Sequence, residues 1–215
     1  MRVTGVFLVC ALFAWATAAC GPGDGAAGPE ELGRARAAVT RLIDPNVDFA
    51  HRADTAWHSP FQPAERDCAR LFDLAEGRPD EEEPALAESA SFEGDHLGET
   101  AGVVLAVYPD GDAGQALRHI RDLIRSCPSA TMDSAGRGDR LVASGLSLRP
   151  LGDGMEARRF RGRVGGYPYE MHLVVVRTGD LLISLVHTGV AHLDPAQTER
   201  LAESITAAVQ EPAGQ

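Results

Sequence analysis

Residues 169–188 read YEMHLVVVRTGDLLISLVHT, and this stretch decides the fold. Thr178-Gly179-Asp180 is a short glycine-containing loop of the kind that joins two antiparallel strands. The runs on either side of it, 173–176 and 181–186, are apolar at nearly every position rather than at alternate ones. A strand with two apolar faces is typical of the covered centre of a sheet. The stretch therefore predicts a central hairpin that needs packing partners on both sides.

The residues around this hairpin predict further strands and amphipathic helices. Apolar side chains recur at helical spacing most clearly over 113–127, after a turn at 109–112 that we expect to cap the helix. The expected strands are 86–92, 100–108, 141–148, 155–164, 169–177 and 181–188, and the expected helices are 31–43, 63–76, 113–127 and a last one opened by Asp194-Pro195. We expect residues 46–62 to be irregular, with Trp57 and Phe61 as anchors, and the acidic loop 78–84 to be solvated. This order predicts one α+β domain with a largely antiparallel sheet and helices packed on it.

The first 19 residues have the layout of a secretory signal peptide, with a basic start, a short apolar run and small residues at its end. Thr17-Ala18-Ala19-Cys20 resembles the lipobox of bacterial lipoproteins, in which the cysteine thiol carries the lipid. An ordinary signal peptide with an incidental cysteine is the alternative. We expect cleavage before Cys20, a flexible Gly/Pro/Ala tether over 20–30 and a single domain over 31–215, anchored through lipidated Cys20 on the extracytoplasmic face of the cell membrane.

The charge balance bears on the partners of the chain. Its formal net charge is −11, and its 20 basic residues are all arginine. Such a balance argues against nucleic acid as a partner, because nucleic-acid binding depends on neutralising phosphates. It also disfavours electrostatic adhesion to anionic lipid, so the lipid on Cys20 has to supply the membrane attachment.

Two cysteines remain once Cys10 leaves with the signal peptide and Cys20 is acylated. In an oxidising compartment Cys68 and Cys127 are expected to pair, and two free buried thiols are the alternative. Both cysteines lie on the apolar stripes of their predicted helices, so the bond is expected to staple the two helices together.

Motifs for catalysis or cofactor binding are missing from the sequence. A Gly-x-Ser-x-Gly nucleophile elbow and a Walker lysine are absent, and none of the seven histidines has metal-ligand spacing. Glycine-rich 162–166 joins strand to strand, so we interpret it as a hairpin turn rather than a phosphate loop. We therefore expect no catalytic residues, no metal and no cofactor, with histidines on the surface or in a polar core.

One row of arginines is the best candidate for a ligand site. The row consists of Arg159, Arg161 and Arg163, which occupy alternate positions of a predicted strand and therefore share one face. Guanidinium groups on one face are able to hold a phosphate or a carboxylate. The alternative is a solvated strand face on which neighbouring acidic residues neutralise the row.

A family resemblance adds to this interpretation. Four segments of the chain resemble the extracellular sensor domain of mycobacterial serine/threonine kinase H. They are Val103-Val104-Leu105-Ala106-Val107-Tyr108, the helix that ends in Cys127, Leu151-Gly152-Asp153-Gly154 before a strand, and 174–183 before the last helix. The same domain also occurs as free-standing lipoproteins of actinobacteria. The resemblance covers about residues 60–210 and implies an α/β sensor-type domain with a cleft, without established catalysis or a common ligand. Typical members carry two disulfides, whereas this chain has cysteines for one.

The residues and the resemblance together lead to a functional expectation. We expect a membrane-anchored extracytoplasmic lipoprotein that acts as a non-enzymatic binding or sensor module for a small ligand or an envelope protein. An envelope hydrolase with an unrecognised site is one alternative, and a structural or chaperone-like lipoprotein is another. A nucleophile, a base and oxyanion donors gathered in one pocket would favour the hydrolase.

Overall fold

The structure is a computed structural model, and it describes Gly33, Ala37 and residues 49–53, 55–78, 84, 86–108, 111–132, 138–190 and 192–210. The expected signal peptide, Cys20 and the tether lie outside the described residues. The helix expected over 31–43 and the acidic loop over 78–84 fall almost entirely outside them as well.

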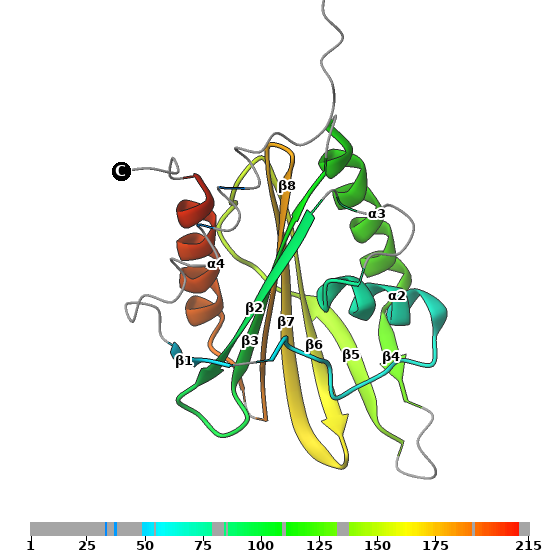
Figure 1. The fold of residues 1–215 in the computed structure, drawn as a ribbon. Helices are drawn as coiled ribbons and strands as arrows, with labels where there is room; N and C mark the ends of the chain where they lie inside the picture. Colours follow the sequence, from blue (N-terminus) through cyan, green and yellow to red (C-terminus); the bar gives the residue numbers. More distant parts are fainter. Residues whose placement is uncertain are drawn as a thin grey trace, which may run out of the picture.

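The described strands form one sheet in which every neighbouring pair is antiparallel (Figure 1). The strands are β1 (Phe49–Arg52), β2 (Leu86–Gly94), β3 (Thr100–Val107), β4 (Ser129–Thr131), β5 (Arg140–Gly145), β6 (Gly154–Val164), β7 (Tyr167–Thr178) and β8 (Leu181–Gly189). Their order across the sheet is β1-β2-β3-β8-β7-β6-β5-β4. The described helices are α2 (Arg66–Ala75), α3 (Asp112–Ser126) and α4 (Pro195–Gln210). The predicted α+β class with an antiparallel sheet is confirmed.

The β7–β8 hairpin occupies the centre of the sheet, as the sequence predicted. Its turn has Gly179 at a φ of 59°, in the left-handed region that glycine adopts readily. Both strands are buried on both faces, because α2 and α3 cover one side of the sheet and α4 covers the other (Figure 1). Two apolar layers result, one with Leu173 and Val175 toward α2 and α3, the other with Val174 and Val176 toward α4.

The helices follow their apolar stripes. In α3 the buried side chains are the expected ones, Ala113, Ala116, Leu117, Ile120, Leu123 and Ile124. At the start of α4, the Asp194 carboxylate accepts the backbone N–H of Ala196 at 2.9 Å, so the predicted cap is present. The cap predicted for α3 is different. Gly111 holds the N-cap position with a φ of 83° and, being a glycine, has no side chain to cap the helix, while residues 109 and 110 of the predicted turn lie outside the described residues.

Two short edge strands depart from the prediction. β1 lies within the segment expected to be irregular, and β4 follows directly after the α3 helix. They contain four and three residues, too few to show the alternation that marks a strand in sequence. Trp57 and Phe61 are buried in the α2 and α3 layer, as the anchors were expected to be.

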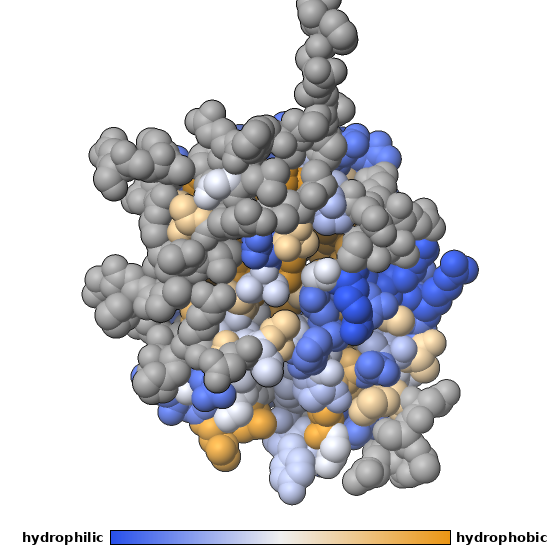
Figure 2. All heavy atoms as spheres, viewed as in Figure 1, coloured by the Kyte–Doolittle hydropathy of each residue, from blue (hydrophilic) through white to orange (hydrophobic). Residues whose placement is uncertain are grey.

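The surface is largely hydrophilic over α2 and α3 in the view of Figure 2, with apolar side chains reaching it near the hairpin tips. Of the large apolar residues that the structure describes, Leu97 is the most exposed, 88% accessible in the turn between β2 and β3. Within the described part of the chain, no helix combines the length and apolar character that crossing a membrane requires.

The tight packing of β6 against β5 at Gly162 generates a stability prediction. A Cβ on Gly162 of β6 would lie 1.8 Å from the carbonyl oxygen of Arg140 on β5, whereas one on Gly145 of β5 meets nothing within 4 Å. Gly162→Ala is expected to lower the free energy of unfolding by about 1–3 kcal/mol, because the strands have to move apart. Gly145→Ala, the matched control, is expected to stay close to wild type. Urea denaturation of both variants measures the difference, and equal stabilities would contradict the packing.

Candidate functional site

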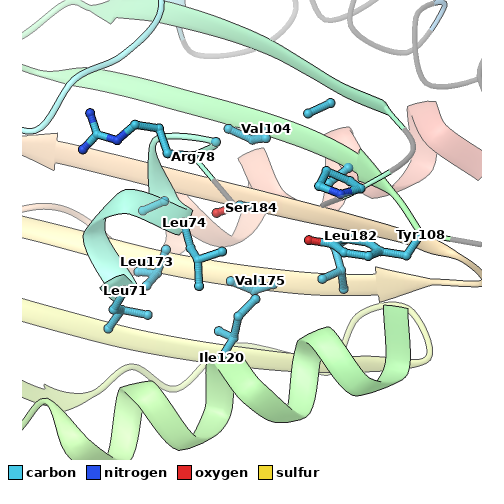
Figure 3. Close-up of a pocket in the computed structure, with 15 residues that line it drawn as sticks. Leu71, Leu74, Arg78, Val104, Tyr108, Ile120, Leu173, Val175, Leu182 and Ser184 are labelled. Atoms are coloured by element: carbon cyan, nitrogen blue, oxygen red, sulfur yellow. The ribbon is translucent and has the colours of Figure 1, made fainter. Parts of the chain in front are cut away.

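An apolar pocket lies between α2, α3 and the central strands (Figure 3). Leu71 and Leu74 of α2 point into it from one side and Ile120 of α3 from another, above Val175 of β7 and Leu182 of β8. The pocket encloses about 40 Å³, within a hollow of about 510 Å³ that opens to solvent. The remaining lining residues are Ala75, Gly77, Arg78, Pro84, Ala87, Val104, Ala106, Tyr108, Leu173 and Ser184.

The pocket offers little polar chemistry. Ser184 contributes a hydroxyl group to its floor, and Arg78 stands at its edge (Figure 3). The Arg78 guanidinium pairs with Asp73 and lies 3.1 Å from the buried carboxylate of Glu76. No histidine occurs among the described residues that line the pocket. This lining suits the apolar part of a ligand.

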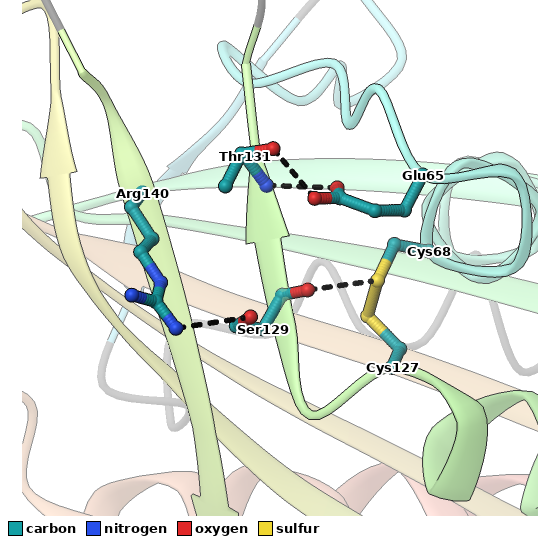
Figure 4. The surroundings of a disulfide bond; sticks show 6 residues. All are labelled: Glu65, Cys68, Cys127, Ser129, Thr131 and Arg140. Atoms are coloured by element: carbon teal, nitrogen blue, oxygen red, sulfur yellow. Dashed lines mark hydrogen bonds between the residues drawn. A yellow bond between two sulfur atoms is a disulfide. The ribbon is translucent and has the colours of Figure 1, made fainter.

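A disulfide joins the beginning of α2 to the end of α3 (Figure 4). The predicted bond between Cys68 of α2 and Cys127, at the end of α3, is present in the structure. The carbonyl oxygen of Ser129 lies 3.4 Å from the Cys68 sulfur. This approach is a packing contact, since a bonded sulfur carries no hydrogen to donate. The bond staples α2 to α3, as the sequence predicted.

Two carboxylates hold α2 at its two ends. Glu65, just before the helix, accepts the backbone N–H and the hydroxyl of Thr131 on β4, at 2.8 and 2.5 Å (Figure 4). These bonds lower the pKa of Glu65 below its ordinary value. Glu76, just after the helix, lies 3.0 Å from His58 Nδ1 and accepts the backbone N–H of Ser59 at 3.2 Å. α2 is therefore tied at both ends while its middle forms a wall of the pocket.

A buried polar network lies on the opposite face of the sheet, under α4. His172 of β7 and His187 of β8 are cross-strand partners, and neither ring is exposed. Each ring places Nδ1 beside the Thr198 hydroxyl in the first turn of α4, at 2.7 Å from His172 and 2.8 Å from His187. Each ring places Nε2 3.0 Å from a carboxylate, that of Glu170 for His172 and that of Glu99 for His187. We call these five side chains the polar network.

Burial and hydrogen bonding oppose each other in this network. Burial lowers the pKa of His172 to about 4, against the raising effect of the Glu170 carboxylate. Burial alone would raise the pKa of Glu99, but hydrogen bonds from His187 and from the backbone N–H of His96 hold it below its ordinary value. Glu99 is therefore a carboxylate at neutral pH although it is nearly inaccessible to solvent.

The network bears on the hydrolase alternative, because a hydroxyl beside a histidine and a carboxylate is the arrangement of a catalytic triad. The Thr198 hydroxyl, however, has no exposed surface and lines none of the described pockets. Both rings and the carbonyl oxygen of Asp194, at 3.4 Å, already surround it. A substrate has no access to this hydroxyl in the observed conformation, so the network is better explained as part of the packing between α4 and the sheet.

The arginine row lies on β6, on the face that carries the polar network. Arg159 Nε is 3.3 Å from the buried Glu170 carboxylate and Arg161 Nε is 3.8 Å from it. Arg163 instead donates to the carbonyl oxygen of Gly166 at 3.4 Å, across the hairpin turn. The structure thus brings two of the three predicted arginines to one internal acceptor. Anion binding by the row stays a prediction.

The sequence led us to expect histidines on the surface or in a polar core, without identifying this network. The partners of the two rings lie 2, 11, 26 and 88 residues away along the chain, so no local motif marks them. The available signal was the pair His172 and His187 within strands that are otherwise apolar on both faces. Among the described side chains, no group of three or more His, Cys, Asp and Glu is placed to hold a metal ion.

Comparisons with known proteins support the fold. No family model and no curated protein sequence matches the chain. Its structure is similar to the crystal structure of the extracellular domain of PknH from Mycobacterium tuberculosis, with a TM-score of 0.54 and 12% sequence identity, over 74% of this chain and 82% of that chain. The chain therefore has the fold of that extracellular domain, as the sequence resemblance predicted. At this identity the likeness shows the fold alone.

The disulfide between α2 and α3 generates a prediction about stability. Cys68 and Cys127 are 59 residues apart, and closing a loop of that length stabilises a protein by about 4 kcal/mol in the chain-entropy model. The double variant Cys68→Ser/Cys127→Ser is expected to lose that order of unfolding free energy in chemical denaturation. Reductant should lower the midpoint of the wild type and leave the double variant unchanged. Equal midpoints for oxidised wild type and double variant would contradict a stabilising bond.

Proposed function

We propose that this protein is a membrane-anchored extracytoplasmic lipoprotein whose domain binds the apolar chain of a small ligand without catalysing a reaction. The observation that carries the proposal is the pocket between α2, α3 and the sheet, lined almost wholly by apolar side chains and open to solvent. Burying apolar surface in such a pocket favours binding by roughly 25 cal/mol per Å². Arg78, half exposed at the edge, is positioned to meet a polar headgroup.

The anchoring part of the proposal rests on the amino-terminal sequence. A signal-like segment that ends in small residues before Cys20, followed by a Gly/Pro/Ala-rich stretch, is the pattern of a lipid-attached protein. A disulfide in the domain fits an oxidising compartment outside the cytoplasm. The likeness to an extracellular domain supports the same location.

Two rival functions are separated from this one by specific observations. A hydrolase needs a reactive group within reach of its substrate, and the described residues that line the pocket include no histidine and no carboxylate. A purely structural lipoprotein has no need for an open apolar hollow, because such surface is normally covered by packing. The pocket therefore favours a binding module.

The membrane anchor is tested at its attachment residue. Metabolic labelling with a fatty-acid analogue is expected to label the wild type and to give no label on Cys20→Ala, because the thiol is the attachment atom. The variant is also expected either to keep its signal segment or to leave the membrane fraction. Cys10→Ala is the matched control and should label like wild type. Label retained on Cys20→Ala would exclude lipid attachment at this residue.

The pocket is tested by its occupant. Native mass spectrometry of protein from the cell envelope is expected to show a bound apolar molecule, and calorimetry should detect binding of palmitate or a lysophospholipid. Leu74→Glu places a charge in a half-buried wall and Ala106→Phe fills the floor, so each is expected to weaken binding about tenfold or more, near 1.4 kcal/mol.

Leu97→Ser is the control for this experiment, since it removes the most exposed large apolar side chain without touching the pocket. Its binding should equal that of the wild type. If binding is lost in Leu97→Ser and kept in both pocket variants, the probes bind the surface. The proposal also fails if neither probe binds and no apolar molecule accompanies the purified protein.

A further inference from the structure

Ser184 interrupts the apolar floor of the pocket (Figure 3). It lies in the middle of β8, and it is the only residue of that strand that keeps partial exposure. Its partners across the sheet are Val104 of β3 and Val175 of β7. Because side chains alternate between the two faces of a strand, Leu182 and Val186 flank it on the pocket side of β8. All four neighbours are apolar and buried, so the exposure of Ser184 comes from the hollow above it.

The hydroxyl group of Ser184 is available to a ligand. It makes no hydrogen bond within the part of the chain that the structure describes, and the side chains of α2 and α3 that line the pocket are all apolar. Other hydroxyl groups nearby are already engaged. Thr188, on the same face of β8, shares a hydrogen bond with Thr100 at 2.7 Å, and Tyr108 at the pocket has a partner within the protein. Ser184 therefore offers an unused donor and acceptor to the occupant of the pocket.

We infer that Ser184 selects apolar ligands that carry an oxygen within the part that the pocket buries, as a hydroxy or keto acyl chain does. The inference rests on the proposed function, because it takes the pocket to be the ligand site. A plain alkyl chain that covers Ser184 takes the hydroxyl group away from solvent and leaves it without a partner, which opposes binding. A hydroxyl or carbonyl oxygen at the same depth restores the lost hydrogen bond.

Two polar points then fix how the ligand lies. Arg78 stands at the edge of the pocket and Ser184 on its floor, with apolar side chains around them (Figure 3). A ligand with a polar headgroup and a second oxygen along its chain is able to meet both points, whereas an unsubstituted fatty chain meets only the first. A few well-placed polar groups in an apolar pocket commonly set orientation and specificity in this way. The separation of headgroup and oxygen along the chain thus becomes part of the recognition.

A simpler role for Ser184 is to be small. Ala87 and Ala106 also line the pocket, and small side chains on a sheet leave room under a helix. Under this alternative, Ser184→Ala binds every ligand as the wild type does, and an oxygen in the chain brings no gain. The two roles therefore differ in what the substitution does to the comparison between two ligands.

Calorimetry with matched probes tests the inference on the purified protein. The probes are palmitate, a set of hydroxypalmitates that differ only in the position of the hydroxyl group, and the corresponding ketopalmitates. The wild type is expected to bind at least one oxygenated chain about tenfold more tightly than palmitate, because only that chain pairs with the serine. Equal binding of the hydroxy and keto acids with the oxygen at one position would support donation of the hydrogen by Ser184.

Ser184→Ala is expected to abolish this preference. It should bind palmitate at least as tightly as the wild type, since no hydroxyl group is left unpaired, and the preferred oxygenated chain about tenfold more weakly. Ser144→Ala is the matched control, because it makes the same change at an exposed position of β5 outside the pocket, and it should keep the wild-type preference. The preference of the wild type is measured without any variant.

The inference is overturned if the wild type binds palmitate as tightly as every oxygenated chain, or if Ser184→Ala keeps the preference. In either case, palmitate binding that Leu74→Glu weakens would leave the pocket as the ligand site, so the proposed function would stand. If no probe binds the wild type, the inference is overturned as well, and the proposed function then depends on the native mass spectrum described above.

Discussion

The burial of the β7–β8 hairpin on both faces is the constraint on which the rest of the structure depends. A sheet centre without a solvent-facing side needs a layer on each face, and it needs a partner for every polar group it carries. The first need accounts for α2 and α3 on one face and α4 on the other. The second accounts for the polar network, because His172 and His187 lie side by side in the same buried rows.

The two faces of the sheet solve the packing problem differently. On the α4 face, a line of hydrogen bonds joins the two central strands β7 and β8 to the first turn of the helix, so the helix is held at a set position. On the other face, α2 is tied at its ends through Cys68, Glu65 and Glu76, and apolar side chains leave a hollow between its middle and the strands. Attachment at the ends is what allows a helix to cover a sheet without filling all the space beneath it.

The sequence predicted the parts of the fold that rest on local pattern. The central hairpin follows from two apolar runs around Gly179, and α3 from apolar spacing. The Cys68–Cys127 pair follows from eliminating the other two cysteines. The edge strands β1 and β4 were missed because three or four residues show no period, and their pairing is fixed by distant neighbours.

The site was harder to predict for the same reason. The pocket is built from six elements, α2, α3, β2, β3, β7 and β8, together with residues around them, and no single segment signals it. The arginine row was visible in sequence, but its main acceptor, Glu170, lies on the neighbouring strand. Which charges meet across a sheet depends on register, and register is set by packing over the whole sheet.

The short strands at the two edges bear on how copies of the protein behave beside one another. An outer strand exposes unpaired backbone groups that a second sheet is able to join, and long flat edges promote aggregation. Here the sheet narrows from twelve residues in β7 to four in β1 and three in β4. Two molecules that meet along these described edges gain few main-chain hydrogen bonds, so the taper of the sheet disfavours edge-to-edge pairing of copies.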